Sequence, residues 1–380
     1  MTSSSSDTVA VREKPKDHVQ LWDAEGAVVF RGDGEPRTPS RTLRQLAELD
    51  ALDVEADTYS LGGSVERLEQ RFAEMLGKES AIFMPTGTLA NHLAIRQLCG
   101  PRQKAIVQEQ SHLYHDSGDC VAKLSGITLV PLAPGRPWFS VDELREAMDL
   151  SDSARVASPI GAVMVESPVR RQSGQVVPFD QMKAISELCE ERRVATHLDG
   201  ARLYMMSAAT GVSARDYAAL FDTVYVSLYK YFGAPFGAIL AGSSEFTNDL
   251  YHERRMFGGG LFSAYLAAAL ALKGTEGFED RFASAMKRAT DLFARMDELP
   301  DIAVRRIEHG SNIFPIELSA EVDIDAFIES LRGRSVFVYA DDDDPSRIRL
   351  TVNTTILRRS TDELMGAFQD AAADGRKART

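Results

Sequence analysis

Several features that mark particular classes of protein are missing from this 380-residue sequence. Acidic residues outnumber basic ones, 56 to 43, and the resulting net charge of −13 leaves no basic surplus for a nucleic-acid partner. No run of eighteen or more apolar residues occurs, so we expect no membrane-spanning helix and no membrane partner. The opening segment MTSSSSDTVAVREKPKD is polar and lacks the apolar stretch of a signal peptide, which predicts a disordered tail over residues 1–17.

Cysteine is scarce, and its placement argues against disulfides. Cys99, Cys120 and Cys189 are odd in number and far apart, a pattern typical of buried free thiols in a reducing cytoplasm. None of the seven histidines stands at metal-ligand spacing from a cysteine or carboxylate, so no metal is expected. The acidic stretch ADDDDPSR (340–347) is predicted as a solvated turn between two strands. Calcium binding is the alternative there, although the EF-hand spacing is absent.

Short β-rich runs do alternate with helical patterns from about residue 80. Strands that read as continuous apolar runs, separated by helices, predict an α/β fold with a mainly parallel sheet covered on both faces. Seven runs are expected as strands: AIFM (81–84), AIV (105–107), ITLVPL (127–132), GAVMVES (161–167), VATHLD (194–199), TVYVSL (223–228) and GAILAG (237–242). Helices are expected at TLANHLAIRQLC (88–99), VDELREAM (141–148) and FDQMKAISELCEERR (179–193).

The pattern changes after about residue 280 and predicts a smaller α+β domain. Helices RFASAMKRATDLFARM (281–296) and DIDAFIESLRG (323–333) alternate there with strands FPIELS (314–319), VFVYA (336–340) and RIRLTVN (347–353). We therefore expect an N-terminal segment and large domain over residues 18–279 and a small domain over 280–380.

In open parallel sheets, ligands bind beyond the carboxyl ends of the strands. TVYVSLYKYFGAPFGAILAG (223–242) places Lys230 between two apolar runs, where a cation loses its hydration. Desolvation lowers the pKa of a lysine and leaves a neutral amine that can attack a carbonyl; the alternative is a stem that snorkels out of the sheet. THLDGARLY (196–204) ends a strand on Asp199 and continues to Arg202, which could also be an ion pair at a helix start.

Two further segments place polar groups at strand ends. In MPTGTLAN (84–91), Thr86, Gly87 and Thr88 stand between a strand and a helix, where free backbone N–H groups and the helix dipole suit a phosphate or, alternatively, a simple N-cap. QSHLYHDSG (110–118) carries His112 and His115, each of which alone could be a surface or core residue. Together, a phosphate cradle, a carboxylate, a reactive lysine and a flat ring are what pyridoxal phosphate requires.

The order and spacing of PTGTLANHLA, SHLYH, HLDGARLY and SLYKYFGAPFGAIL resemble the threonine aldolases, which are fold-type-I pyridoxal-phosphate enzymes in the group that includes β-eliminating lyases. The resemblance extends from about residue 31 to residue 353. It implies a fold-type-I transferase-like architecture, pyridoxal phosphate as cofactor and a small amino acid as substrate.

The resemblance also implies roles for the cofactor-binding residues. Lys230 is implied as the lysine that joins the cofactor as a Schiff base, Asp199 as the partner of its pyridine nitrogen, and His112 as the side chain that stacks on its ring. The segment with Thr86, Gly87 and Thr88 would hold the phosphate.

Substrate and subunit contacts follow from the same resemblance. Arg202, which also borders the cofactor, and Arg349 in RIRLTVN would bind the substrate carboxylate, and Ser40 in TPSRT matches a substrate-contacting serine. Tyr59 in DTYSLGG and Arg255 in ERRMFGGG match positions that reach the site of a second subunit. A homodimer or homotetramer with shared active sites is therefore expected.

The substrate end departs from the family pattern. Where threonine aldolases read Glu-Asn-Thr-His-Asn, this chain reads ESPVRRQSG, so Val169 replaces a histidine near the substrate β-hydroxyl, and Arg170 and Arg171 follow it. Phe262 and Tyr229 also differ from the family's usual residues. The proton acceptor for the β-hydroxyl is then His115, His112 or a water. Alternatively, Arg170 or Arg171 binds a second anionic group or a polar side chain of another substrate, or is simply solvated.

The expected reaction is retro-aldol cleavage of a β-hydroxy-α-amino acid to glycine and an aldehyde. Because the bond that breaks is the one aligned with the π-system of the cofactor, a small change at the substrate end could switch the reaction. A β-eliminating lyase, or another enzyme that abstracts the Cα proton such as a racemase, is the alternative on this scaffold. A cofactor-binding protein without catalysis is disfavoured by the presence of Lys230, Asp199 and Arg202.

Overall fold

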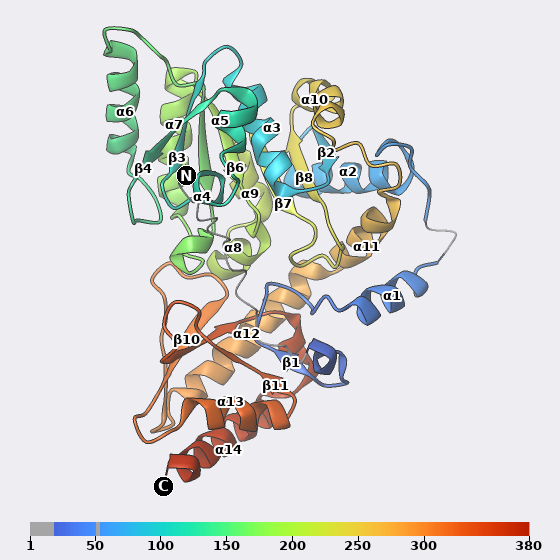
Figure 1. The fold of residues 1–380 in the computed structure, drawn as a ribbon, viewed down its shortest axis with the longest axis vertical. Coiled ribbons are helices and arrows are strands. Elements are labelled where there is room, and N and C mark those ends of the chain that lie inside the picture. Colours follow the sequence, from blue (N-terminus) through green and yellow to red (C-terminus); the bar gives the residue numbers. More distant parts are fainter. Residues whose placement is uncertain (1–18, 51–53, 380) are drawn as a thin grey trace, which may run out of the picture.

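The computed structural model describes residues 19–50 and 54–379, so the predicted tail over residues 1–17 lies outside it. Within the described residues, the large domain is built on a seven-stranded sheet of order β2-β8-β7-β6-β5-β3-β4 (Figure 1). Within this sheet β8 is antiparallel to both of its neighbours, β2 and β7, and the remaining neighbouring strands are parallel. The predicted mainly parallel sheet is confirmed, with each strand within one residue of its expected bounds. The strands are β2 (Ser80–Met84), β3 (Lys104–Gln108), β4 (Thr128–Leu132), β5 (Ala162–Glu166), β6 (Ala195–Asp199), β7 (Thr223–Ser227) and β8 (Ala238–Gly242).

Helices cover both faces of this sheet, as continuous apolar strands require. In β5, Val163 and Val165 join the cluster that contains α2, α7, α8 and α9, whereas Ala162 and Met164 face α3 and α5. The helices of this domain are α2 (Gly63–Leu76), α3 (Gly87–Cys99), α4 (His112–His115), α5 (Cys120–Ser125), α6 (Val141–Ser153), α7 (Phe179–Arg192), α8 (Leu203–Thr210), α9 (Ala214–Ala219), α10 (Ser244–Met256) and α11 (Tyr265–Thr275).

The predicted smaller α+β domain forms from the C-terminal part of the chain, drawn in orange and red in Figure 1. Its antiparallel sheet has the order β12-β13-β10-β9. The run VFVYA, expected as one strand, divides into β11 and β12 in two different sheets, because β11 pairs instead with β1 near the N-terminus. The elements are α12 (Phe278–Met296), β9 (Ile302–Val304), β10 (Ile313–Leu318), α13 (Ile324–Gly333), β11 (Val336–Phe337), β12 (Tyr339–Ala340), β13 (Arg347–Thr351) and α14 (Thr361–Arg379).

The N-terminal segment packs against this C-terminal part. β1 (Val28–Val29) runs parallel to β11, and Val28 and Phe30 belong to the same apolar cluster as α13 and α14. α1 (Pro39–Ala47) then leads back towards the large domain (Figure 1). The expected division at residues 279 and 280 remains a prediction. The helix α12 spans it, with Phe278 and Phe282 in the core of the large domain and its last turns in the core of the small one.

No helix in the described part of the chain is long and apolar enough to cross a membrane.

Candidate active site

Most of the residues predicted for cofactor binding meet in one small cavity. It lies beyond the carboxyl ends of β5, β6 and β7, at the N-terminus of α3, where a parallel sheet of this kind binds ligands. The residues that line it are Gly87, Thr88, Asn91, His112, Glu166, Arg170, Asp199, Ala201, Arg202, Tyr225 and Lys230.

Lys230 supplies a poorly solvated amine to this cavity. Burial and the nearby Arg202 guanidinium lower the pKa of Lys230 to about 8. Its Nζ has no hydrogen bond or ion pair to any residue in 19–50 or 54–379. About a tenth of Lys230 is therefore neutral at pH 7, far more than for an ordinary lysine, and the neutral amine is the form that condenses with a carbonyl. This lowered pKa agrees with the predicted desolvation rather than with a stem that snorkels out of the sheet.

Asp199 is held at the end of β6 by a chain of buried polar groups. Its Oδ2 accepts a hydrogen bond from Asn91 Nδ2 at 2.6 Å, and its Oδ1 accepts one from the backbone N–H of Ala201 at 3.1 Å. Asn91 Oδ1 lies 2.9 Å from Nε2 of His197, and Nδ1 of His197 lies 2.8 Å from Oγ1 of Thr223. Because a carboxylate only accepts, Asn91 donates to it and His197 donates to Asn91.

The strand and helix periods produce this arrangement. His197 and Asp199 are two residues apart in β6 and therefore point to the same face, towards α3, where Asn91 lies opposite both. Burial lowers the pKa of His197 to about 4, so its ring is neutral and adds no charge next to Asp199. The chain thus keeps the carboxylate oriented and leaves it able to accept one more hydrogen bond from a ligand.

The other end of the cavity fits a phosphate. A Cβ on Gly87 would lie 2.1 Å from the Tyr225 hydroxyl oxygen, so only glycine lets α3 begin this close to β7. Thr86 caps α3 by accepting the N–H of Leu89 at 3.1 Å, which leaves the N–H groups of Gly87 and Thr88 to a ligand. The buried hydroxyl of Ser227 is on the same face of β7 as Tyr225, whose hydroxyl it approaches. The residues present therefore fit pyridoxal phosphate.

The two arginines predicted for the substrate carboxylate differ in position. Arg202 lines the cavity, and its Nε donates to Asp33 Oδ2 at 2.8 Å, while its terminal nitrogens have no hydrogen bond within the described residues. Arg349 does not line the cavity. Its guanidinium donates to both oxygens of Asp341, at 2.7 and 3.0 Å, and to Asp343 at 3.2 Å. The acidic turn ADDDDPSR thus pairs with the guanidinium of Arg349, which was expected to bind the substrate carboxylate.

Four further predicted residues also lie outside the cavity lining. Ser40 donates to Asp23 at 2.5 Å, and His115 contacts Glu109 at 2.9 Å through Nε2. Tyr59 and Arg255 contact each other, with the guanidinium carbon 4.2 Å from the ring centroid. In a single chain their roles therefore remain predictions.

At the position that departs from the threonine aldolases, Val169 is fully buried in the core of the large domain. Of the two arginines that follow, Arg170 lines the cavity and Arg171 does not. Both approach the same carboxylate, Asp116, at 3.5 and 3.3 Å.

Comparison with known proteins decides the family. Residues 38–318 match the family model described as beta-eliminating lyase, which is well over half of the chain. The chain belongs to the β-eliminating lyase family.

The expected resemblance to threonine aldolases is confirmed among its relatives. The chain is 31% identical over 54% of its length to a low-specificity L-threonine aldolase of Candida albicans, covering 55% of that protein. It is also 31% identical over 64% of its length to the alanine racemase TOXG of Cochliobolus carbonum, covering 61% of it. The chain thus spans less than two thirds of the length of these curated relatives.

The solved structure of a provisionally assigned L-allo-threonine aldolase from Listeria monocytogenes supports the fold. It superposes with a TM-score of 0.76 at 26% identity, over 94% of this chain and 98% of that one. The expected fold-type-I architecture is confirmed.

Sequence reasoning missed several polar residues of the site in this member of the β-eliminating lyase family, above all one acidic group. Glu166 ends β5 beside Asp199, its register partner on β6, and lines the cavity. Burial, and then the Asp199 charge, raise the pKa of Glu166 to about 7. The signal was available, since Glu166 is a carboxylate at the end of a predicted strand, as Asp199 is. Asn91 and His197 were likewise visible as polar residues inside apolar runs.

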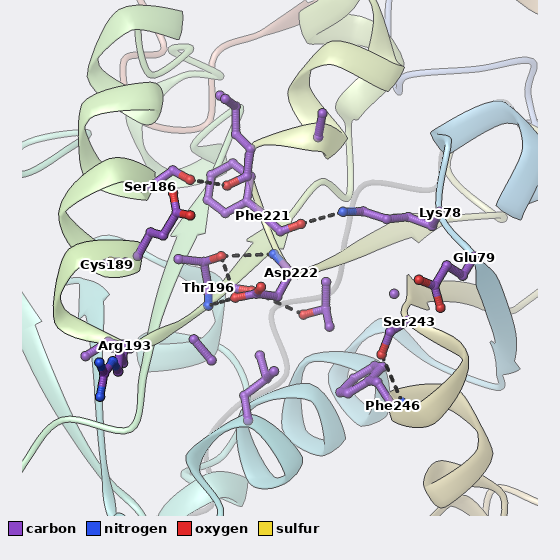
Figure 2. Close-up of a pocket in the computed structure, with 18 of the residues that line it drawn as sticks. Lys78, Glu79, Ser186, Cys189, Arg193, Thr196, Phe221, Asp222, Ser243 and Phe246 are labelled. Atoms are coloured by element: carbon purple, nitrogen blue, oxygen red, sulfur yellow. Dashed lines mark hydrogen bonds between the residues drawn. The ribbon is translucent and has the colours of Figure 1, made fainter.

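A larger cavity lies at the opposite, amino-terminal edge of β6 and β7 (Figure 2). Two of its charged groups already have protein partners: Lys78 Nζ donates to the carbonyl of Phe221 at 2.5 Å, and Asp222 accepts from the backbone N–H and hydroxyl of Thr196. Burial raises the pKa of the Cys189 thiol there to about 12, so it stays protonated. The chemistry therefore belongs to the smaller cavity.

Replacing Gly87 tests the phosphate end of the site. We expect Gly87→Ala to weaken the binding of pyridoxal phosphate by at least about tenfold, because the methyl group collides with Tyr225 and displaces the start of α3. Fluorescence titration of the apoprotein with the cofactor measures this. Gly366→Ala in α14 is the control, since a Cβ there meets nothing within 4 Å. Unchanged affinity in Gly87→Ala would contradict the assignment.

Proposed function

We propose that this chain is a pyridoxal-phosphate-dependent lyase that cleaves a β-hydroxy-α-amino acid to glycine and an aldehyde. One observation carries the proposal: the amine of Lys230, which has no ion pair in the described part of the chain, and the hydrogen-bonded carboxylate of Asp199 line the same cavity at the sheet edge. Lys230 joins the cofactor, Asp199 pairs with the pyridine nitrogen, and Gly87, Thr88 and the Ser227 hydroxyl hold the phosphate. When bound, the cofactor withdraws electrons from the bonds of the substrate Cα.

The remaining side chains orient the substrate. The terminal nitrogens of Arg202 bind the α-carboxylate, and the ion pair of its Nε with Asp33 keeps the guanidinium plane fixed. With the carboxylate and the amine both anchored, the Cα–Cβ bond can be held in the orientation that favours its cleavage. This is positioning by a pre-organised group, which lowers the entropic cost of reaction.

A proton acceptor is needed for the β-hydroxyl. Of the two histidines predicted for this task, His112 lines the cavity, while His115 is turned towards Glu109. Burial lowers the pKa of His112, so its ring is neutral and able to accept a proton. We assign the proton transfer to His112, whose backbone N–H is fixed by Glu166 at 2.5 Å.

The second candidate is a β-eliminating lyase or another enzyme that abstracts the Cα proton. Two observations favour it: Val169 cannot accept a proton and is buried, and one relative of similar identity is an alanine racemase. Such an enzyme would use the same lysine and carboxylate but break the Cα–H bond.

Product analysis separates these reactions. The holoenzyme is incubated with threonine, allo-threonine and phenylserine, with serine and O-acetylserine, and with L-alanine. Glycine and the matching aldehyde support the proposal. Pyruvate and ammonia support elimination, and D-alanine supports racemisation. Either result without any glycine would overturn the carbon–carbon lyase.

We also propose a homodimer with shared active sites as the smallest working unit, in the cytoplasm, where the three free thiols stay reduced. The support is a set of exposed apolar side chains in the segments that meet at the Tyr59–Arg255 and Tyr59–Phe262 contacts, which we call the apolar cluster: Tyr59, Leu61, Met256, Phe262 and Leu266. Single exposed apolar residues are ordinary, but a contiguous group is typical of an interface. The ring of Phe262 contacts that of Tyr59 edge-on, with centroids 5.5 Å apart.

A charge placed in this cluster tests the dimer. We expect Phe262→Asp to yield monomers and to lose most activity, because a carboxylate would be buried without a partner at the interface. Sedimentation velocity and turnover measure the two effects. Leu150→Asp is the control, since Leu150 is similarly exposed on α6, away from the cluster. A dimeric, active Phe262→Asp protein would rule out this surface.

A further inference from the structure

We propose that the substrate of this lyase carries an acidic group on its β-carbon substituent and that Arg170 binds that group. The inference rests on the proposed function and names the substrate class of the same cavity. The recognised chemistry is an oxyanion, carboxylate or phosphate, which the planar fork of a guanidinium binds in two-point fashion.

Arg170 is fixed at the cavity by a buried carboxylate. Its backbone N–H donates to Glu166 Oε1 at 3.0 Å, while Glu166 Oε2 accepts the backbone N–H of His112 at 2.5 Å. One side chain therefore ties together the two loops that carry His112 and Arg170, and both of these residues line the cavity that contains Lys230. The side chain of Arg170 is 57% exposed, so a substrate can reach it.

Arg170 and Arg171 share one carboxylate. Asp116 is at 3.5 Å from one guanidinium and 3.3 Å from the other. The other carboxylate next to Arg170, Glu166, accepts backbone N–H groups and not a guanidinium. Because neither arginine has Asp116 to itself, the Arg170 guanidinium keeps donors for an anionic ligand at the mouth of the cavity.

The other arginines leave this role to Arg170. Arg202 pairs with Asp33 through Nε and has its terminal nitrogens available for the α-carboxylate. Arg349 is held by Asp341 and Asp343. A second acidic group of the substrate therefore meets Arg170, the remaining guanidinium of the cavity lining in the described chain.

The reaction balances for the simplest such substrate, 3-hydroxyaspartate. The Cα–Cβ bond breaks, the β-hydroxyl gives up its proton, and its oxygen becomes the aldehyde oxygen of glyoxylate. The Cα then takes a proton, which yields glycine. No oxidant, reductant or further reactant is consumed.

The test compares 3-hydroxyaspartate with 3-hydroxyasparagine, whose β-substituent has the same shape without the charge. We expect kcat/KM of the holoenzyme to be about tenfold to a hundredfold higher for the acid, the size of one charge-assisted hydrogen bond. Arg170→Gln should abolish this preference, and Asp116→Asn should increase it by freeing Arg170. The matched control is Arg136→Gln, an exposed arginine paired with Glu143 outside the cavity lining, which should keep the preference.

Binding measurements separate failure of this inference from failure of the proposed function. Calorimetry of the holoenzyme should show succinate binding at least about tenfold more tightly than butyrate, with the difference lost in Arg170→Gln. If no β-hydroxy amino acid is cleaved but succinate binding behaves in this way, the proposed function fails and the Arg170 site stands. The inference is overturned if the wild type binds succinate and butyrate equally, or if it has the same kcat/KM for 3-hydroxyaspartate and 3-hydroxyasparagine. It is also overturned if Arg170→Gln lowers kcat/KM by the same factor for these two substrates.

Discussion

Replacing Lys230 by alanine is expected to lower kcat by at least about 10³-fold, because no other amine in the cavity lining can condense with the cofactor carbonyl. The variant should also lose the visible absorbance that arises when the cofactor is bound covalently. Absorbance spectra and single-turnover assays with threonine measure the two effects. Full activity in Lys230→Ala would remove the basis of the proposed chemistry.

The fold should survive this change, and its stability gives an independent check. Burial lowers the pKa of Lys230 to about 8, so the folded apoprotein carries a poorly solvated cation below that pH. We expect Lys230→Met to be the more stable apoprotein at pH 7. The wild type should regain the difference as pH rises from about 8 towards the ordinary lysine value of about 10.4, where the unfolded chain holds the proton more tightly.

Lys78 provides the matched control for Lys230. Its pKa is also lowered by burial, but it lies in the larger cavity at the opposite edge of the sheet and donates to the carbonyl of Phe221. Lys78→Ala should therefore keep the visible absorbance and the turnover, even if the protein unfolds at a lower temperature. Loss of the absorbance in both variants would point to a general folding defect.

Asp199→Asn is expected to lower kcat by about 10²–10³-fold while the protein stays folded. An amide has nearly the same shape but no charge, so it cannot stabilise a protonated pyridine nitrogen, and such a preorganised charge accounts for effects of this size. Steady-state kinetics and the pH dependence of the cofactor spectrum measure the change. Asp199→Asn should move the spectroscopic pKa, which a merely structural role would not do.

Asn91 separates the charge of Asp199 from its orientation. Asn91→Leu removes the 2.6 Å hydrogen bond but keeps the carboxylate, so we expect a smaller loss of kcat than in Asp199→Asn. The reverse order would mean that Asp199 serves mainly to hold α3 against the sheet.

The sheet could be predicted from the sequence because its strands are buried on both faces. Continuous apolar runs such as GAVMVES and TVYVSL stand out from their helical surroundings, and the seven strands predicted for the large sheet are the seven that the structure places in it. The pairing of β1 with β11 could not be predicted, because it joins two-residue strands about 300 positions apart. VFVYA likewise reads as one apolar run, and its division between two sheets depends on that distant partner.

At the site, the positions of residues at the ends of strands could be predicted from the sequence, whereas the contacts of long side chains could not. Asp199 ends one strand of the sheet, Lys230 follows another, and Gly87 is at the start of α3. Their positions therefore follow from the alternation of strands and helices along the sequence. Arg349 and His115 were expected to serve the same site, but each is turned to a nearby carboxylate, Asp341 or Glu109. Such pairings depend on side-chain rotamers and on neighbouring loops, which periodicity does not specify.

The central claim is that Lys230 and Asp199 hold pyridoxal phosphate between them, and the most direct test is chemical. The holoprotein is reduced with borohydride, digested, and analysed by mass spectrometry for the peptide that carries the pyridoxyl group. The account predicts a single modified site at Lys230, with labelling retained in Lys78→Ala and lost in Lys230→Ala. A label on Lys78 or another lysine, or a protein that binds the cofactor but cannot be labelled at all, would contradict it.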